Sequence, residues 1–171
     1  MELRFRPATL EDLPRLTEIY NQAIRSRVCT ADLDEMTPEK RTSWFMEHKD
    51  PRYPLIVAES KGAVLGYATL TPYRPGRAAV SHVAEISYYL DFAARGQGVG
   101  SQLLAHMLAL APALGITDLF AICLGVNSAS AGLLKKHGFS LWGRLPGVVH
   151  IDGHEIDHLL YGRKLKAIPH K

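Results

Sequence analysis

The run Arg95-Gly96-Gln97-Gly98-Val99-Gly100 constrains the fold of this chain more than any other stretch of its sequence. An apolar segment, Val83 to Leu90, precedes the run and a leucine-rich segment follows it, so the run is predicted to join a strand to a helix. Glycines at three of five consecutive positions allow a tight turn in which backbone N–H groups converge at the mouth of that helix. The run is therefore predicted to bind a phosphate group.

Hydrophobic periodicity divides the rest of the chain into strands and helices. The predicted order is β-α-α-β-β-β-α-β-α-β-β, which is one α/β domain over residues 1–171 on a mixed sheet. Strands are expected at residues 2–6, 55–58, 63–68, 83–90, 119–124, 139–145 and 156–165, and helices at about 10–25, 38–49, 101–111 and 128–137. The aromatic residues expected in the core are Trp44, Phe45, Phe120, Phe139 and Trp142. The irregular stretch 26–36 is a candidate wall of a substrate pocket.

Composition narrows the class of protein. A hydrophobic content of 47% with 22% charged residues is typical of a soluble globular domain. No apolar run approaches the ~20 residues that span a bilayer, and the first residues do not resemble a signal peptide, so a cytoplasmic location without membrane contact is expected. The formal charge of +3 suits a polyanionic small ligand better than a nucleic acid. Cys29 and Cys123 are expected to be reduced thiols, with a catalytic cysteine as the less favoured alternative.

Spacing excludes two common kinds of phosphate-binding loop. A Walker loop needs Lys-Ser/Thr after its last glycine, whereas Gly100 is followed by Ser101-Gln102. A dinucleotide-binding loop needs Gly-x-Gly-x-x-Gly, whereas Gly96, Gly98 and Gly100 are spaced two and two.

The pattern Arg-x-x-Gly-x-Gly between a strand and an amphipathic helix resembles motif A of the GNAT N-acetyltransferase superfamily. A second motif lies downstream, where Asn127, Ser130, Leu133, Lys136 and Gly138-Phe139 resemble the asparagine-led helix of that family. The resemblance implies a mostly antiparallel sheet, splayed between its fourth and fifth strands and flanked by about four helices. It also implies that acetyl-CoA binds at Tyr88, Tyr89, Leu90, Arg95, Gly96, Gln97, Gly98, Val99, Gly100, Ser101, Asn127, Ser130 and Lys136.

Within that superfamily the chain is similar to the phosphinothricin and methionine-sulfoximine acetyltransferases. The stretches that carry this similarity are 19–23, 44–45, 54–58, 65–68, 73–75 and 85–90. The similarity implies a small-amine acceptor, an amino acid or an analogue of one, and a homodimer. Tyr73 and Glu155 are expected near the acceptor, and Arg74 or Arg77 is available to bind an acceptor carboxylate.

Acetyl transfer to an amine needs a base, because amines of free amino acids are largely protonated near neutral pH. Glu85 is the only acid in the predicted strand 83–90, and apolar neighbours would raise its pKa, which suits a base. The alternative is a solvated glutamate at an edge of the sheet. In the resemblance, Glu85 matches the proposed catalytic glutamate.

Two positions depart from the family pattern. The family has Tyr or His seven residues after the asparagine, placed to protonate the leaving thiolate, and here that residue is Leu134. Either the thiolate leaves without an acid, or Tyr88, Tyr89 or His137 serves. The subfamily has Gly-x-Trp-x-Asp in its last strand, and here Glu155 stands in place of the tryptophan. This departure leaves open whether the acceptor is phosphinothricin or methionine sulfoximine or a different small amine.

Two other functions remain as alternatives. Without an acid at Leu134, the chain could be a non-catalytic acyl-CoA sensor. The stretch His154-Glu155-Ile156-Asp157-His158 also matches His-Glu-x-x-His, which on a helix binds zinc in hydrolases. Asp157 within this stretch, and the lack of any later His, Asp or Glu except His170, argue against a zinc site, so no metal is expected.

Overall fold

A computed structural model of the protein describes residues 1–166. The strands in these residues are β1 (Arg4–Pro7), β2 (Leu55–Ser60), β3 (Ala63–Pro72), β4 (Val83–Leu90), β5 (Asp118–Leu124), β6 (Ser140–Ile151) and β7 (His154–Lys164). They form one sheet in the order β1-β2-β3-β4-β5-β7-β6. Only β4 and β5 are parallel neighbours, and the other pairs are antiparallel. The prediction of a mixed, mostly antiparallel sheet is confirmed.

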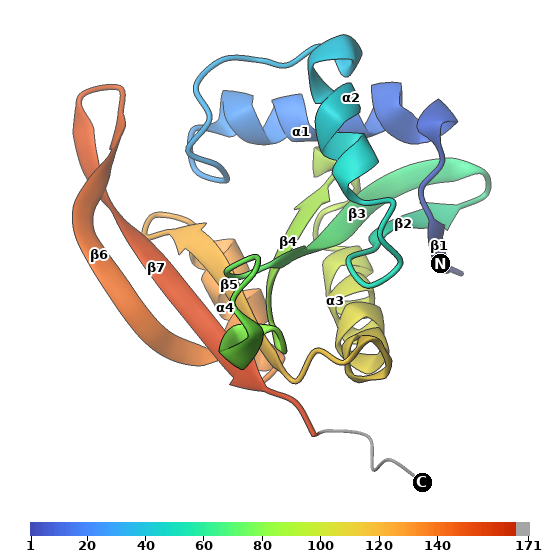
Figure 1. Ribbon diagram of the computed structural model, residues 1–171. Helices are drawn as coiled ribbons and strands as arrows, with labels where there is room; N and C mark the ends of the chain where they lie inside the picture. The colour runs from blue at the N-terminus through green and yellow to red at the C-terminus, as the bar shows by residue number, and fades with distance from the viewer. Residues whose placement is uncertain (167–171) are drawn as a thin grey trace, which may run out of the picture.

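Two helices cover each face of the sheet (Figure 1). Helices α1 (Leu13–Ser26) and α2 (Pro38–Glu47) lie on one face, and α3 (Val99–Leu110) and α4 (Ser128–Lys136) lie on the other. Successive strand residues point to opposite faces, so β2 sends Val57 toward α1 and α2, and Ala58 toward α3. Each face therefore has its own apolar core, and the predicted order of helices and strands is confirmed. No helix within residues 1–166 is both long and apolar enough to cross a membrane.

The sheet opens between its fourth and fifth strands. β4 and β5 pair at three positions only, Val83 with Asp118, Ala84 with Leu119 and Glu85 with Phe120. Beyond Glu85 the two strands diverge (Figure 1), while β5 pairs with β7 along its whole length. The splay that the resemblance implied is present. It leaves the second half of β4 with one edge that faces no neighbouring strand.

The β6–β7 hairpin is longer than the sequence predicted. β6 continues to Ile151 rather than ending at Leu145, because a register shift between Leu145 and Val149 absorbs Pro146 and Gly147. A two-residue turn, Asp152-Gly153, then closes the hairpin with positive φ at both residues.

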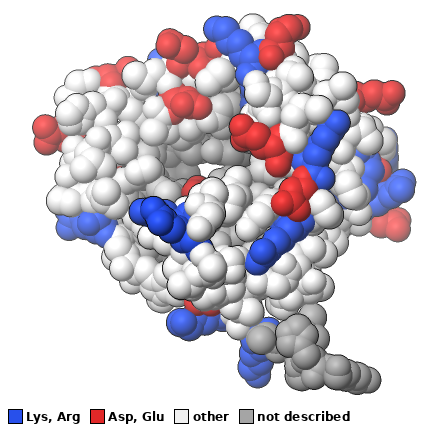
Figure 2. Space-filling view, viewed as in Figure 1, with Lys and Arg blue, Asp and Glu red and all other residues white. Residues whose placement is uncertain are grey.

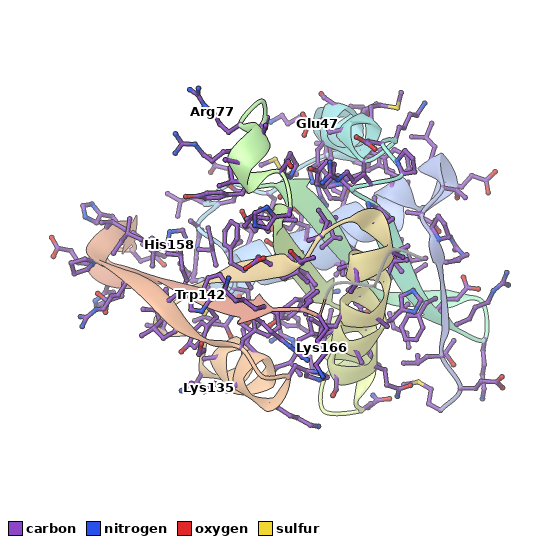
Figure 3. All side chains as sticks on the ribbon, turned by 60° about the horizontal axis from the view of Figure 1, so that its bottom comes forward. Glu47, Arg77, Lys135, Trp142, His158 and Lys166 are labelled. Carbon is purple, nitrogen blue, oxygen red and sulfur yellow. The ribbon has the colours of Figure 1, made fainter. Side chains whose placement is uncertain are left out.

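The prediction that Trp142 belongs to the core is wrong, because Trp142 is 48% exposed. Trp142 lies on β6, the edge strand of the sheet (Figure 3), and its ring lies against Gly162 of β7. Of the other aromatic residues expected in the core, Phe45, Phe120 and Phe139 are buried and Trp44 is half-buried. An edge strand has no neighbour to cover the outer part of such a side chain.

A partly buried ion pair connects β1 to the start of the first helical segment. Arg6 donates two hydrogen bonds to Asp12, with Nη1–Oδ2 and Nη2–Oδ1 distances of 2.7 and 2.9 Å. The backbone N–H of Thr9 donates to Asp12 Oδ2 at 2.7 Å, and Arg6 Nε donates to Glu59 of β2 at 2.8 Å. The Asp12 side chain is only 10% exposed. These hydrogen bonds from Arg6 hold the pKa of Asp12 below its ordinary value.

Asp12→Asn should lower the free energy of unfolding at pH 7 by about 2 kcal/mol, because it removes charge-assisted hydrogen bonds and leaves Arg6 partly unpaired. Since the pKa of Asp12 is lower in the folded state, its stabilisation is present above its ordinary pKa of 3.8 and is lost as pH falls through the folded value. Urea unfolding at several pH values measures both effects. Asp34→Asn, at an exposed position, is the control, and equal unfolding free energies for the two variants at pH 7 would contradict the assignment.

Candidate active site

A cavity of about 330 Å³ occupies the space where β4 and β5 part. Its walls come from the second half of β4, the middle of β5, the loop after α1 and the first turn of α4. Figure 2 shows the hollow between the side of the molecule formed by the β6–β7 hairpin and the side formed by α1 and α2. The expected wall in stretch 26–36 is present, because Val28 and Cys29 line the cavity.

Two helix N-termini lie at the open end of the sheet. α3 follows β4 and α4 follows β5, and the carboxyl ends of parallel strands lie on the same side of a sheet. The first N–H groups of each helix have no acceptor within the helix, and the helix dipole adds partial positive charge there. Neither helix has an acidic residue in its first turn. Together they form a region suited to a negatively charged ligand.

The glycine run forms the entrance to α3. Gly98 is the N-cap residue and has φ of 81°, so the helix begins at Val99 and not at residue 101 as predicted. Gly96 also has positive φ, and it lines the cavity with Arg95. The residues that follow are not part of the cavity lining: Gln97, Gly98, Val99, Gly100 and Ser101.

Arg95 makes specific contacts although it is exposed. Its guanidinium stacks 3.4 Å from the ring centre of Phe92, and Nη2 donates to Cys29 Sγ at 3.4 Å. Since Cys29 also lines the cavity, these contacts place the positive charge of Arg95 at the cavity wall.

The start of α4 brings Asn127 and Ser130 to the cavity. Asn127 Oδ1 accepts a hydrogen bond from the backbone N–H of Ser130 at 3.1 Å, so Asn127 is the N-cap of α4 as well as a lining residue. Ser130 Oγ lies 2.6 Å from the hydroxyl of Tyr88. Lys136 lies in the last turn of α4, at the other end of the helix, and does not line the cavity.

Glu85 lies where the splay begins. It is the last residue of β4 that pairs with β5, and its side chain is half-buried. Burial raises the pKa of Glu85, and a hydrogen bond of 3.4 Å from Ser87 Oγ acts in the opposite direction. Glu85 is not itself part of the cavity lining, but Ser87, two residues along the same face of β4, is.

Tyr88, Tyr89 and Leu90 all line the cavity, on alternating faces of β4. Tyr88 packs toward α3 and α4, whereas Tyr89 packs among Tyr20 and Tyr67 on the other face. Burial raises the pKa of Tyr88 to about 12. Leu134 is fully buried in the core and carries no polar group toward the cavity.

Four residues named for the acceptor lie outside the cavity lining. Tyr73 is 45% exposed and its ring makes an edge contact with Phe120, 5.4 Å between ring centres. Arg74 is exposed on the loop after β3, and Arg77 of the same loop lies at the outside of the molecule (Figure 3). Glu155 is exposed near the tip of the β6–β7 hairpin, opposite His150. The structure does not bring these side chains together.

The His-Glu-x-x-His stretch is part of strand β7, as the favoured prediction of a strand there required. Four residues along a strand span about 13 Å, so His154 and His158 cannot both reach one metal ion at zinc–nitrogen distance. Figure 3 labels His158 on the β6–β7 hairpin. Within residues 1–166, no three His, Cys, Asp or Glu side chains are grouped so that they could hold a metal. His170, the one His, Asp or Glu that follows this stretch in the sequence, lies outside the described residues.

Sequence reasoning missed the part of the cavity that β5 contributes. Ala121, Ile122 and Cys123 line it, although their stretch reads as an ordinary buried strand. These residues face the cavity only because β4 diverges from β5, and no residue type in β5 predicts that divergence.

Comparison with known proteins identifies the family. The family model described as an acetyltransferase (GNAT) domain matches residues 2–140. The chain therefore belongs to the GNAT acetyltransferases, and as a member of this family it is an enzyme.

Its relatives carry more specific names. YwnH of Bacillus subtilis, named as a phosphinothricin acetyltransferase on a provisional basis, is 43% identical over 95% of this chain and 99% of the relative. The L-methionine sulfoximine/L-methionine sulfone acetyltransferase of Pseudomonas paraeruginosa is 33% identical over 92% of this chain and 91% of its own length. The crystal structure of a phosphinothricin acetyltransferase from Sinorhizobium meliloti in complex with acetyl-CoA is 31% identical, with a TM-score of 0.89 over 96% of this chain and 89% of that one.

Proposed function

We propose that the protein transfers the acetyl group of acetyl-CoA to the amine of a small molecule, an amino acid or an analogue such as phosphinothricin or methionine sulfoximine. The observation that carries the proposal is the cavity between β4 and β5, which lies beside the N-termini of two helices. The names of the relatives support the substrate class, and the acetyl-CoA bound to a homologous structure supports the donor.

The coenzyme is proposed to use backbone groups for most of its contacts. Its pyrophosphate would accept hydrogen bonds from N–H groups of Gly96 to Ser101 at the start of α3, assisted by the charge of Arg95. Its pantetheine arm would lie along the open edge of β4 at Tyr88 to Leu90, opposite Asn127 and Ser130. An extended ligand gains main-chain hydrogen bonds at such an edge in the way an added strand does.

Glu85 is proposed as the general base. The acceptor nitrogen attacks the thioester carbon, its proton passes to Glu85 directly or through water, and the carbon–sulfur bond then breaks to release the thiolate. Support comes from the raised pKa of Glu85, because a carboxylate that binds a proton more tightly is a stronger base. Support also comes from its position at the last pair before the splay.

The acceptor is proposed to approach from the side of Tyr73, Arg74 and Glu155. Arg74 offers a guanidinium to an acceptor carboxylate, and Glu155 offers a carboxylate to a cationic group. Because these side chains are exposed and lie outside the cavity lining, they are proposed to affect the choice of acceptor and to leave the donor site unchanged.

We also propose that the protein forms a homodimer and acts in the cytoplasm. Support for a self-association surface comes from Leu141, Trp142, Leu145 and Val148, exposed apolar residues on the edge strand β6. Sedimentation velocity should give a dimer for the wild-type protein and a monomer for Trp142→Glu. A monomeric wild type would refute the dimer and leave the proposed reaction untouched.

The experiment that tests the proposed function is an acetyl-transfer screen over amino acids, polyamines and peptide N-termini, with the released thiol as the readout. Turnover with amino acids or their analogues supports the proposal. Turnover with peptide N-termini alone would overturn the substrate class. Coenzyme binding without product from any acceptor would favour the sensor function that the absence of an acid at Leu134 allows.

Glu85→Gln should lower kcat by about 10²- to 10⁴-fold, because the amide cannot take the amine proton, while the Kd for acetyl-CoA stays unchanged. Steady-state kinetics and calorimetric titration with acetyl-CoA give the two quantities. Glu47→Gln, an exposed position on α2 (Figure 3), is the matched control and should keep wild-type turnover. A parallel loss of coenzyme binding in Glu85→Gln would sink the assignment as a base.

Gly98→Ala should weaken acetyl-CoA binding, because an L-residue resists the φ of 81° that aims the N–H groups at the start of α3. Its backbone strain, about 1 kcal/mol, should also appear in urea unfolding. Gly62→Ala is the control, since Gly62 has φ of 79° in the β2–β3 turn, with no heavy atom within 4 Å of an added Cβ. The two variants should lose similar stability, and only Gly98→Ala should lose affinity for acetyl-CoA. Equal affinities of the two variants for acetyl-CoA would contradict the proposed phosphate binding at the start of α3.

A further inference from the structure

We propose that Tyr88 is a further catalytic residue, whose hydroxyl donates a hydrogen bond to the coenzyme sulfur as the carbon–sulfur bond breaks. This inference rests on the proposed acetyl transfer. It assigns the stabilisation of the leaving thiolate to a side chain of β4, in a chain whose α4 offers no acid for that role.

Tyr88 is placed to meet the sulfur. The pantetheine arm of the coenzyme begins at the proposed phosphate site at the start of α3, and its thioester must come within reach of an amine at Glu85. The arm therefore has to pass the residues of β4 that lie between the start of α3 and Glu85. Tyr88 lines the cavity on that path, and its hydroxyl lies 2.6 Å from Ser130 Oγ in the first turn of α4. The hydroxyl is therefore held at the face of β4 opposite Glu85.

This role suits four other side chains less well than Tyr88: Tyr89, His137, Leu134 and Cys123. The ring of Tyr89 packs against Tyr20 and Tyr67 on the other face of the sheet. His137 Nε2 lies 2.8 Å from Ser101 Oγ, and His137 is not a lining residue. Leu134 has no polar atom in its side chain. Burial raises the pKa of Cys123, which leaves its thiol neutral and a weak donor.

Tyr88 stabilises the thiolate without giving up its proton. Its pKa of about 12 is well above the ~8.5 of a typical thiol, so the phenol remains protonated beside a thiolate. The acceptor's proton goes to Glu85, the electron pair of the carbon–sulfur bond goes to sulfur, and the thiolate takes a proton from solvent after release. If Ser130 donates to the Tyr88 oxygen, the phenolic proton is free to point at the sulfur.

Tyr88→Phe should lower kcat about 10- to 100-fold, which is the loss of one hydrogen bond to a charged group, with little change in the KM for acetyl-CoA. The second readout is the pKa of the thiol of bound CoA, followed by the ultraviolet absorbance of the thiolate. That pKa should be about one unit higher in Tyr88→Phe than in the wild type, because the thiolate loses its donor. A purely structural role for Tyr88 would leave the thiol pKa unchanged.

The matched control is Tyr53→Phe, which removes a phenol oxygen outside the cavity lining and should alter neither quantity. Ser130→Ala keeps the phenol of Tyr88 but removes the hydroxyl to which it is hydrogen-bonded. It should raise the thiol pKa by less than Tyr88→Phe does, and it tests the inference if Tyr88→Phe does not fold. A wild-type thiol pKa in a folded Tyr88→Phe or Ser130→Ala overturns the inference while leaving the acetyl transfer standing. If the wild type acetylates nothing, the proposed function fails, and the thiol titration still decides whether Tyr88 contacts the sulfur.

Discussion

The rest of the structure depends on the parting of two parallel strands after three paired residues. Buried backbone groups need hydrogen-bond partners, so a strand edge that faces a cavity is stable only beside water or a ligand. β5 pairs with β7 along its whole length, so β5, β7 and β6 diverge from β4 together. The open edge of β4 is thus fixed by the architecture, and both helices that follow the diverging strands begin beside it.

β4 also separates the two kinds of chemistry that acetyl transfer needs. Alternation along the strand directs Glu85 and Ser87 to the face covered by α1 and α2, and Ile86 and Tyr88 to the face covered by α3 and α4. With Glu85 as the proposed base on one face and Tyr88 as the proposed donor on the other, the two side chains can act on opposite sides of a thioester bound at the edge between them. One short strand is enough because its neighbours in sequence point in opposite directions.

Much of this arrangement could be predicted from the sequence, where local patterns decide the structure. The bounds of β4 were predicted correctly because an apolar run ends at the glycine loop, and α4 because Asn127 caps it and Gly138 ends it. α3 was predicted too short because its N-cap is glycine, which gives no capping side chain to recognise. β6 was also predicted too short, because Pro146-Gly147 is typical of the end of a strand, whereas the chain turns only at Asp152-Gly153.

What the sequence could not supply is the spatial relation between segments far apart in the chain. Cys29 and Cys123 share a cavity, and Tyr88 meets Ser130 across 42 positions of sequence, and no local pattern encodes either juxtaposition. The proposed acceptor residues are the hardest to predict, because Arg74 and Glu155 lie on exposed segments whose packing does not fix their direction.

The glycine cradle and the open edge of β4 have a consequence for how such an enzyme can change over evolution. The proposed donor site is formed mainly by main-chain N–H groups, which every residue except proline supplies. Side chains on the loop after β3 and on the β6–β7 hairpin can therefore be exchanged without rebuilding the donor site. On the proposed placing of the acceptor, new acceptors become accessible through surface substitutions, so a change of substrate need not pass through an inactive or unfolded ancestor.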